Sequence, residues 1–362
     1  MKNFFASNKG LIVAGALIGL IAVCLQKLGN PGNMGVCVVC FERDLAGSLG
    51  LHRAEIVQYA RPEIFALALG SFGAALFFGE FRPRGGSSPV VRFFLGAVVA
   101  VGALVFLGCP WRALLRLAGG DWNAIFGLAG LICGVAAGAV FFRQNYSLGR
   151  NLPGRRALGL IFPLFMLALL GLRLTFPQIE GEAKNDLLFY SLTGPGSMHA
   201  AFGFSLAAGL IIGLLGQRSR FCAIGAFRDL ILFRQAHLFL GVLGFLGAAF
   251  VGNLALGQFH PGFENQPIAH TQSLWNFLGL FTAGLASALA GGCPARQLFL
   301  AGEGDGDAAC FVLGLMGGAA MAHNWSMASS GAGIGPHGMA AVVAGLVLTL
   351  FIGLMFRAKN AA

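Results

Sequence analysis

Gly108-Cys109-Pro110-Trp111-Arg112 and Gly292-Cys293-Pro294-Ala295-Arg296 are two nearly identical segments, each placed where a long apolar stretch ends. Each is followed by a Leu-Ala-Gly sequence and then by an aspartate, within residues 117–121 and 300–305. The two copies lie 184 residues apart. Such similarity at a long, fixed offset indicates an internal repeat.

A second motif repeats at almost the same offset. Cys37 is followed by Arg43-Asp44, and Cys222 is followed by Arg228-Asp229 at the same spacing, 185 residues later. Two independent matches at nearly one offset indicate that the chain arose by duplication, with one copy in residues 1–180 and the other in residues 190–362.

The composition identifies the solvent as a lipid bilayer. Of the 362 residues, 57% are hydrophobic and only 10% are charged, far below the roughly 25% charged residues of a soluble domain. So few charges could not cover the surface of a soluble protein of this size, which excludes a cytosolic enzyme or nucleic-acid-binding protein. We attribute the net charge of +10 to membrane orientation.

Ten apolar stretches are long enough to cross a bilayer, which takes about 20 helical residues. They lie at residues 10–28, 62–79, 90–108, 122–142, 157–176, 198–216, 237–257, 273–292, 308–325 and 337–356. The first is expected to be a retained span, because it continues past any signal-peptide pattern. The sequence therefore predicts an all-α polytopic membrane protein with a single integral membrane domain of about ten transmembrane helices.

Basic residues set the expected orientation. With the N-terminus in the cytoplasm, the inside segments hold sixteen of the 24 Lys and Arg residues, from Lys2 and Lys9 to Arg357 and Lys359. The acidic loops around Glu182 and Glu264 then lie outside. This distribution predicts that both termini are cytoplasmic. Because each copy contains five spans, an odd number, the second copy must cross in the opposite direction, giving inverted repeats typical of secondary transporters.

Each Cys-Pro motif predicts a re-entrant half-helix. Proline favours the first helical position and glycine favours the helix end, which predicts short helices at Pro110–Gly119 and Pro294–Gly302, too short to span. Cys109 and Cys293 then occupy the cap positions, where the helix N-terminus attracts anions. We expect the two half-helices to enter from opposite faces, so that their thiols meet at one central point.

The candidate functional residues belong to these repeated motifs. A thiol is a weak, polarizable S–H donor that suits a soft anion, whereas each Arg-Asp pair most simply neutralises itself. Cys24, Cys133 and Cys310 lie mid-span without a motif and are expected to be small buried side chains. The candidate path residues are Cys37, Cys40, Cys109, Cys222 and Cys293, with supporting residues Arg43, Asp44, Arg112, Arg228, Asp229 and Arg296.

The segment at residues 33–44, together with residues 292–298 and 301–308, resembles the YeeE/YedE family of sulfur-compound transporters, and is most similar to the YedE branch linked to selenium metabolism. The resemblance implies an hourglass-shaped protein of the bacterial inner membrane that imports thiosulfate and passes it along three cysteines. By motif, these correspond to Cys37, Cys109 and Cys293. It also implies a small cytoplasmic sulfur- or selenium-carrier protein as a partner, and no cofactor.

Cys40 and Cys222 add thiols to the three-cysteine pattern and leave open whether the cargo contains sulfur or selenium. They also leave open whether Cys37 or Cys40 faces the path. The main alternative is a membrane thiol-disulfide oxidoreductase that uses the Cys37-x-x-Cys40 pair. A passive anion channel would share the same architecture. Zinc binding lacks a second ligand pair, and no phosphate-binding loop is present, so we expect a transporter and not an enzyme.

Overall fold

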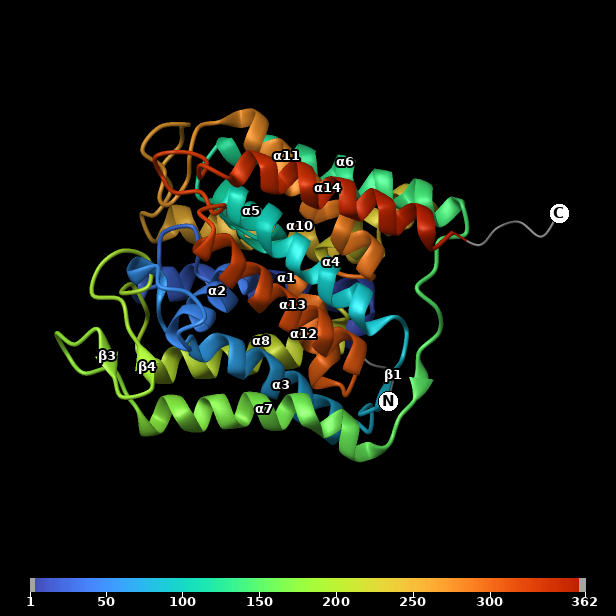
Figure 1. Cartoon of the computed structure of the whole chain (residues 1–362), viewed down its shortest axis with the longest axis horizontal. Helices are drawn as coiled ribbons and strands as arrows, with labels where there is room; N and C mark the ends of the chain where they lie inside the picture. Colours follow the sequence, from blue (N-terminus) through green and yellow to red (C-terminus); the bar gives the residue numbers. More distant parts are fainter. Residues whose placement is uncertain (1–3, 358–362) are drawn as a thin grey trace.

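A computed structural model describes residues 4–357, so that Lys2 and Lys359 lie outside the described residues. In this part of the chain, ten helices are long and apolar enough to cross a membrane, which confirms the predicted all-α, multi-pass fold (Figure 1). Their bounds agree with the ten predicted stretches to within a few residues. They are α1 (Asn8–Lys27), α3 (Pro62–Phe77), α4 (Pro89–Phe106), α6 (Asn123–Arg143), α7 (Arg156–Thr175), α8 (Phe202–Ser219), α10 (His237–Ala255), α11 (Ser273–Ala290), α13 (Gly306–Asn324) and α14 (Gly338–Met355).

Four shorter helices interrupt this series, and each begins directly after a cysteine. They are α2 (Val38–Ser48), α5 (Pro110–Ala118), α9 (Ala223–Phe233) and α12 (Pro294–Gly302). Their N-cap residues are Cys37, Cys109, Cys222 and Cys293, all in extended backbone conformation. The two short helices predicted from the Cys-Pro motifs are therefore present, and each of the other two repeated cysteines also begins one.

The remaining elements are small and lie in connections. Two 3-10 turns occur at η1 (Phe4–Ala6) and η2 (Glu55–Val57). Strand β1 (Arg84–Gly85) pairs antiparallel with β2 (Leu152–Pro153), and β3 (Lys184–Asn185) pairs antiparallel with β4 (Leu188–Phe189). They connect the helices and form no layer of their own.

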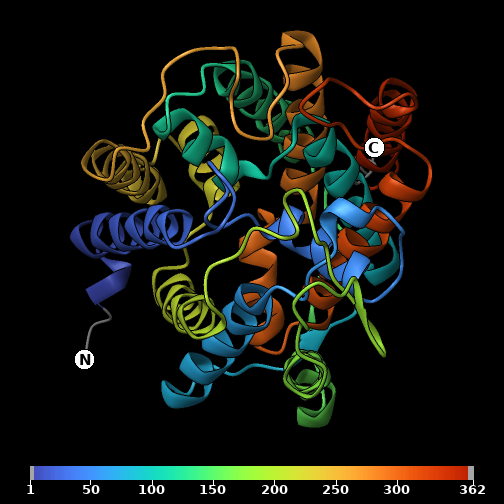
Figure 2. The same ribbon diagram turned by 90° about the vertical axis from the view of Figure 1, so that its left-hand side faces the viewer.

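Helices from the two halves of the chain pack against one another. Helix α1 packs on α10 and α3 packs on α8, while α6 packs on α11 and α4 packs on α13. Figures 1 and 2 both show α1 and α10 side by side although they are far apart in the sequence. Each of these contacts has a counterpart when the helices of the first half are exchanged for those of the second. The last helix of each half differs, because α7 packs on α3 whereas α14 packs on α4 and α11.

Glycines four residues apart allow the closest of these helix contacts. A Cβ atom on Gly130 or Gly134 of α6 would lie 2.0 or 2.2 Å from a backbone oxygen of α11. Gly314 of α13 is placed in the same way, 2.1 Å from the carbonyl oxygen of Phe93 in α4. Small residues at this spacing let helix backbones touch within a membrane. The high glycine content, 56 residues, thus serves close helix packing.

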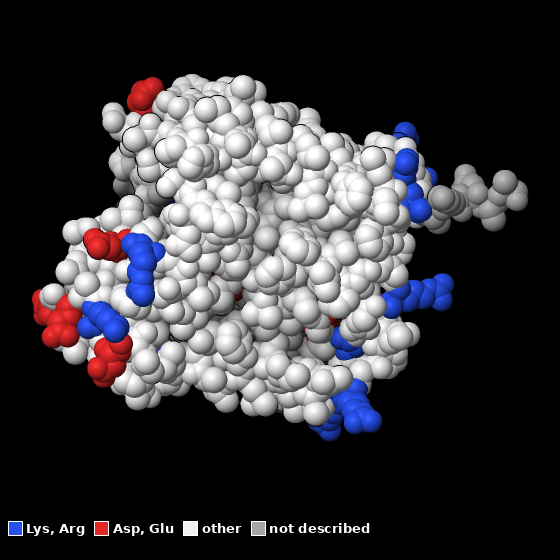
Figure 3. Space-filling view, in the orientation of Figure 1, with Lys and Arg blue, Asp and Glu red and all other residues white. Residues whose placement is uncertain are grey.

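Charges gather at the two ends of the helix bundle. Figure 3 shows most of the visible Lys and Arg side chains at one end and most of the Asp and Glu side chains at the other, with an uncharged surface between them. The basic end includes the loop around Arg84, and the acidic end includes the loop between α7 and α8 with β3 and β4. An uncharged belt between two charged ends is the surface expected of a protein that spans a bilayer.

Candidate functional site

The four short helices meet as two pairs, and a cysteine sulfur joins each pair. In the first pair, the Sγ atom of Cys37 accepts hydrogen bonds from the backbone N–H of Cys40, at 3.4 Å, and from that of Cys109, at 3.5 Å. The first bond caps α2 itself, and the second reaches the start of α5. One sulfur therefore lies where two helix N-termini converge, the partly positive ends of both helices.

The second pair repeats this arrangement. The Sγ atom of Cys222 accepts from the backbone N–H of Gly225 at 3.2 Å and from that of Cys293 at 3.4 Å. It thereby joins the N-terminus of α9 to that of α12. Two cysteines separated by 185 residues thus make the same two bonds to corresponding partners.

Cys109 and Cys293 occupy the N-cap positions, as predicted, and the structure adds which thiols make the capping hydrogen bonds. The side chains of Cys109 and Cys293 make no cap hydrogen bond. The capping thiols are instead those of Cys37 and Cys222. In the described part of the chain, hydrogen bonds from a backbone N–H to a sulfur link these four cysteines as two pairs.

An aromatic cluster links the two pairs. Trp111, two residues after Cys109, packs its ring against Phe221 at 5.4 Å and against Phe299 at 6.1 Å between centroids. Phe221 immediately precedes Cys222, and Phe299 lies on α12. All three rings are almost fully buried, and the indole Nε1 of Trp111 has no hydrogen-bond partner in the described residues. The region between the two thiol pairs is therefore filled by side chains, and the structure is closed there.

Sequence reasoning did not select Trp111. The repeated motif already differs at this position, because the second copy has Ala295 where the first has Trp111. A large ring on one half-helix and a methyl group on the other allow a single indole to fill the space that two would have to share.

Cys40 lies next to the first pair. Its Sγ atom accepts from an Nη1 of Arg112 at 3.8 Å, whereas Cys37 contacts Cys109. Both cysteines of the Cys-x-x-Cys motif therefore contact the first residues of the segment that forms α5. All five candidate path cysteines are at most 5% exposed.

Arg112 is a fully buried cation without a carboxylate partner. Its guanidinium donates to the carbonyl oxygens of Asn33, Leu107 and Ile268, and among the described residues it forms no ion pair. Carbonyl oxygens satisfy its N–H groups but leave its charge uncompensated. The first thiol pair therefore lies in a positive electrostatic environment.

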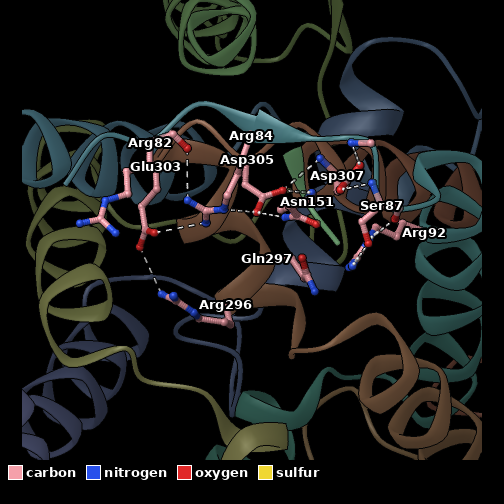
Figure 4. A network of polar contacts seen from close by, with 12 residues as sticks. Arg82, Arg84, Ser87, Arg92, Asn151, Arg296, Gln297, Glu303, Asp305 and Asp307 are labelled. Carbon is pink, nitrogen blue, oxygen red and sulfur yellow. Dashed lines mark hydrogen bonds and ion pairs between the residues drawn. The ribbon is translucent and has the colours of Figure 1, made fainter. Parts of the chain in front are cut away.

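The equivalent arginine at the second pair is neutralised. Nη1 of Arg296 lies 3.3 Å from Glu303, whose carboxylate also pairs with Arg220 at 3.0 Å and with Arg84 at 3.6 Å. Figure 4 shows Arg84 and Arg296 directed at Glu303 from two sides. The carboxylate is 3% exposed. The carboxylate of Glu303 thus already lies among three arginines beside the second thiol pair.

The two Arg-Asp pairs neutralise themselves in different surroundings. Asp44 is buried and accepts from Arg43 at 2.6 Å and from Arg61 at 2.7 Å. Asp229 pairs with Arg228 at 2.8 Å, but these side chains are 20% and 28% exposed. Neither aspartate forms a hydrogen bond with a thiol in the described part of the chain. Asp44 links α2 to Arg61 at the start of α3, whereas the ion pair of Asp229 lies within α9.

The cysteines outside the repeated motifs lie elsewhere. Cys24 and Cys133 are exposed and Cys310 is partly exposed, so the prediction that they are buried was wrong. They lie on transmembrane helices, where an exposed thiol faces lipid and behaves as a small apolar group.

The geometry gives no support to the oxidoreductase alternative. All eight cysteines are free thiols, and Cys37 and Cys40 are completely buried. Thiol-disulfide exchange with a partner requires that the partner reach the attacked sulfur. Among residues 4–357, no three His, Cys, Asp or Glu side chains are grouped so that they could hold a metal ion.

Replacement of Asp44 by asparagine is predicted to destabilise the protein strongly, because it leaves Arg43 and Arg61 buried without a counter-charge. Breaking a buried ion pair in this way costs about 3–5 kcal/mol. The matched control is Asp229→Asn, at the half-exposed copy of the motif, where the loss should be under about 1 kcal/mol. Thermal unfolding of both variants in detergent measures the difference; equal melting temperatures would show that the Asp44 cluster is not a structural anchor.

The comparisons with known proteins agree with this architecture. A family model described as "Sulphur transport" matches residues 218–359. The "Thiosulfate transporter TsuA" of Escherichia coli is 33% identical over 99 residues, which cover 27% of this chain and 28% of that protein. The protein of the same name from Spirochaeta thermophila is 32% identical over 99 residues, covering 27% of this chain and 29% of that protein. The chain thus aligns with less than a third of the length of these relatives. Together with the repeated cysteine motifs, these partial matches support the resemblance of the chain to the YeeE/YedE family of sulfur transport proteins.

Proposed function

We propose that the protein is a transporter that imports a small sulfur- or selenium-containing anion along a path formed by its two thiol pairs. The observation that carries this proposal is the meeting of paired helix N-termini at Cys37 and at Cys222. The printed names of the two curated relatives, both thiosulfate transporters, support the same class of cargo.

The chemistry of the path suits such an anion. Helix N-termini present partial positive charge and N–H groups, and thiols add weak, polarizable S–H donors. A sulfur or selenium atom of the cargo is itself soft, so a thiol matches it better than a hydroxyl group does. The cargo moves from Cys37 and Cys109 to Cys222 and Cys293 by exchanging hydrogen bonds, without covalent chemistry. The closed aromatic cluster at Trp111 must open between the two positions.

Electrostatics give this path a direction. The first pair has the uncompensated charge of Arg112, which attracts an anion, whereas the charge of Arg296 at the second pair is already balanced by Glu303. An anion is therefore held more strongly at the first pair and less strongly at the second. This favours capture at one side and release at the other.

We further propose that the chain consists of two inverted repeats, residues 1–180 and 190–362. The corresponding helix contacts and the matching hydrogen bonds of the two thiol pairs support this division. Inverted repeats place the substrate site near the bilayer midplane and permit alternating access.

The expected location is the bacterial inner membrane, with both termini in the cytoplasm. The basic end of the bundle supports this orientation, because Lys and Arg accumulate on the cytoplasmic side of membrane proteins. The second thiol pair then lies toward the cytoplasm, where a small sulfur- or selenium-carrier protein would receive the cargo. Whether selenium replaces sulfur in that cargo is decided by the uptake experiment that follows.

Uptake of labelled thiosulfate, selenite and sulfate by cells that lack their own transporter tests the thiol path. Serine variants of Cys37, Cys109, Cys222 and Cys293 are each predicted to slow uptake by roughly tenfold, the equivalent of about 1.4 kcal/mol, because a hydroxyl group is a poorer partner for a soft anion. Cys133→Ser, at a lipid-facing thiol, is the control and should transport normally. Wild-type rates in all four path variants would disprove the thiol path.

Arg112→Gln is predicted to weaken apparent affinity for the anion more than Arg296→Gln does. A hydrogen bond to a charged group contributes about 1.5–3 kcal/mol, and only Arg112 has no internal carboxylate that already uses its charge. The KM for uptake, measured for both variants at equal membrane abundance, provides the comparison. Equal KM values would mean that Arg112 only supports the fold.

A further inference from the structure

Glu42 is a buried carboxyl group without a hydrogen-bond partner among residues 4–357. It lies on α2, five residues after the capping Cys37, and its side chain is completely inaccessible to solvent. Neither of its carboxyl oxygens has a hydrogen-bond partner in the described residues, and it forms no ion pair there. The adjacent Arg43 is directed at Asp44, with Nε and Nη2 both bonded to the same aspartate oxygen.

The fold does not require a carboxyl group at this position. Counting five residues from Cys222 gives Phe227, the corresponding residue of α9. Phe227 is also buried, and its ring packs against Phe239 at 5.8 Å between centroids. The same place in the second copy is therefore filled by an apolar side chain. A polar group that the structure does not need, in a site where it has no partner, points to a function.

None of the charged and titratable groups on the surrounding elements is bonded to Glu42 in the described residues, although Nε2 of His323 and Oε2 of Glu63 are also buried there without a hydrogen-bond partner. Helix α2 packs against α13, α3, α4, α12, η2 and β4. Within α13, Asp307 accepts from Gly86 and Ser87, and His323 stacks on His52. Glu63 is bonded to Asn30 and Ser205, and Arg92 is bonded to Ser87 and Ala290. Arg296 is paired with Glu303. Cys310 is partly exposed, and Glu55 is exposed.

The lack of polar partners identifies the ion that Glu42 binds as a proton. An ionised carboxylate without partners is very unfavourable in an apolar interior, so the group must be neutralised in this closed conformation. A sodium or other metal ion would need several oxygen ligands at once, and the described residues form no such group around Glu42. A proton needs only the one carboxyl oxygen to which it is bonded.

We propose that Glu42 carries a proton together with the anion, so that proton influx drives uptake. This inference rests on the proposed transport function. The carboxylate takes up one proton from the outside when the path is open to that side. The O–H bond persists while the path around α2 is closed. When the path opens to the cytoplasm, water reaches Glu42 and accepts the proton. The membrane potential is negative inside and opposes the influx of an anion, and each co-transported proton offsets one negative charge of the cargo, one of the two in the case of thiosulfate.

The purified protein in liposomes tests this proposal with labelled thiosulfate, in the presence and absence of a pH gradient, acid outside. For wild type, each pH unit of gradient should raise the accumulation ratio by roughly tenfold per coupled proton. Glu42→Gln should still equilibrate thiosulfate but should not respond to the gradient. Glu42→Phe, which copies the second repeat, should behave in the same way. Phe227→Leu is the matched control on α9 and should keep the wild-type response.

A pH-sensitive dye inside the liposomes gives an independent readout of proton movement for wild type and for Glu42→Gln. Thiosulfate influx should acidify the interior in wild type but not in Glu42→Gln. The proposal is overturned if wild type carries thiosulfate without a response to the gradient or without acidification, or if Glu42→Gln responds as wild type does. If wild type carries no thiosulfate, selenite or sulfate under any gradient, the transport function itself fails, and the coupling role fails with it.

Discussion

The contact on which this architecture depends is a cysteine sulfur that accepts backbone N–H groups from two helices at once. Cys37 makes it for α2 and α5, and Cys222 makes it for α9 and α12. Non-helical backbone inside a membrane is tolerated only where its polar groups are satisfied or face a watery cavity. Each sulfur satisfies N–H groups that would otherwise be orphaned and leaves a soft, polar point inside the protein. The same contact thus explains how the short helices begin inside the protein and, in the proposed function, why an anion stops there.

The two copies differ at several positions, and in the proposed mechanism these differences make the path directional. Trp111 fills the space between the thiol pairs while its counterpart is Ala295. Arg112 retains an uncompensated charge while the corresponding arginine of the second copy is neutralised. Glu42 is an unpartnered carboxyl group where the second copy has a phenylalanine. A fully symmetric path would treat both sides of the membrane alike, whereas a path with these differences can capture on one side and release on the other.

Much of this fold could be predicted from the sequence because hydropathy and helix-end chemistry act locally. The ten spans follow from the lengths of apolar stretches, and the half-helix starting at Pro110 follows from a proline at its beginning and a glycine at its end. The pairing of Cys37 with Cys109 could not be predicted, because it depends on how segments 72 residues apart pack in space. The same limit applies to the pairing of Cys222 with Cys293. Comparing the two copies residue by residue would have revealed Trp111 and Glu42.

The most direct test of the account is to locate the bound anion by crystallography, using selenosulfate and the anomalous signal of its selenium atom. The account predicts a selenium peak within hydrogen-bonding distance of the Cys37–Cys109 pair and near Arg112, with a second, weaker site at Cys222 and Cys293. A selenium atom that binds away from all five path cysteines, for example in the apolar groove lined by Phe162 and Leu313, would contradict it.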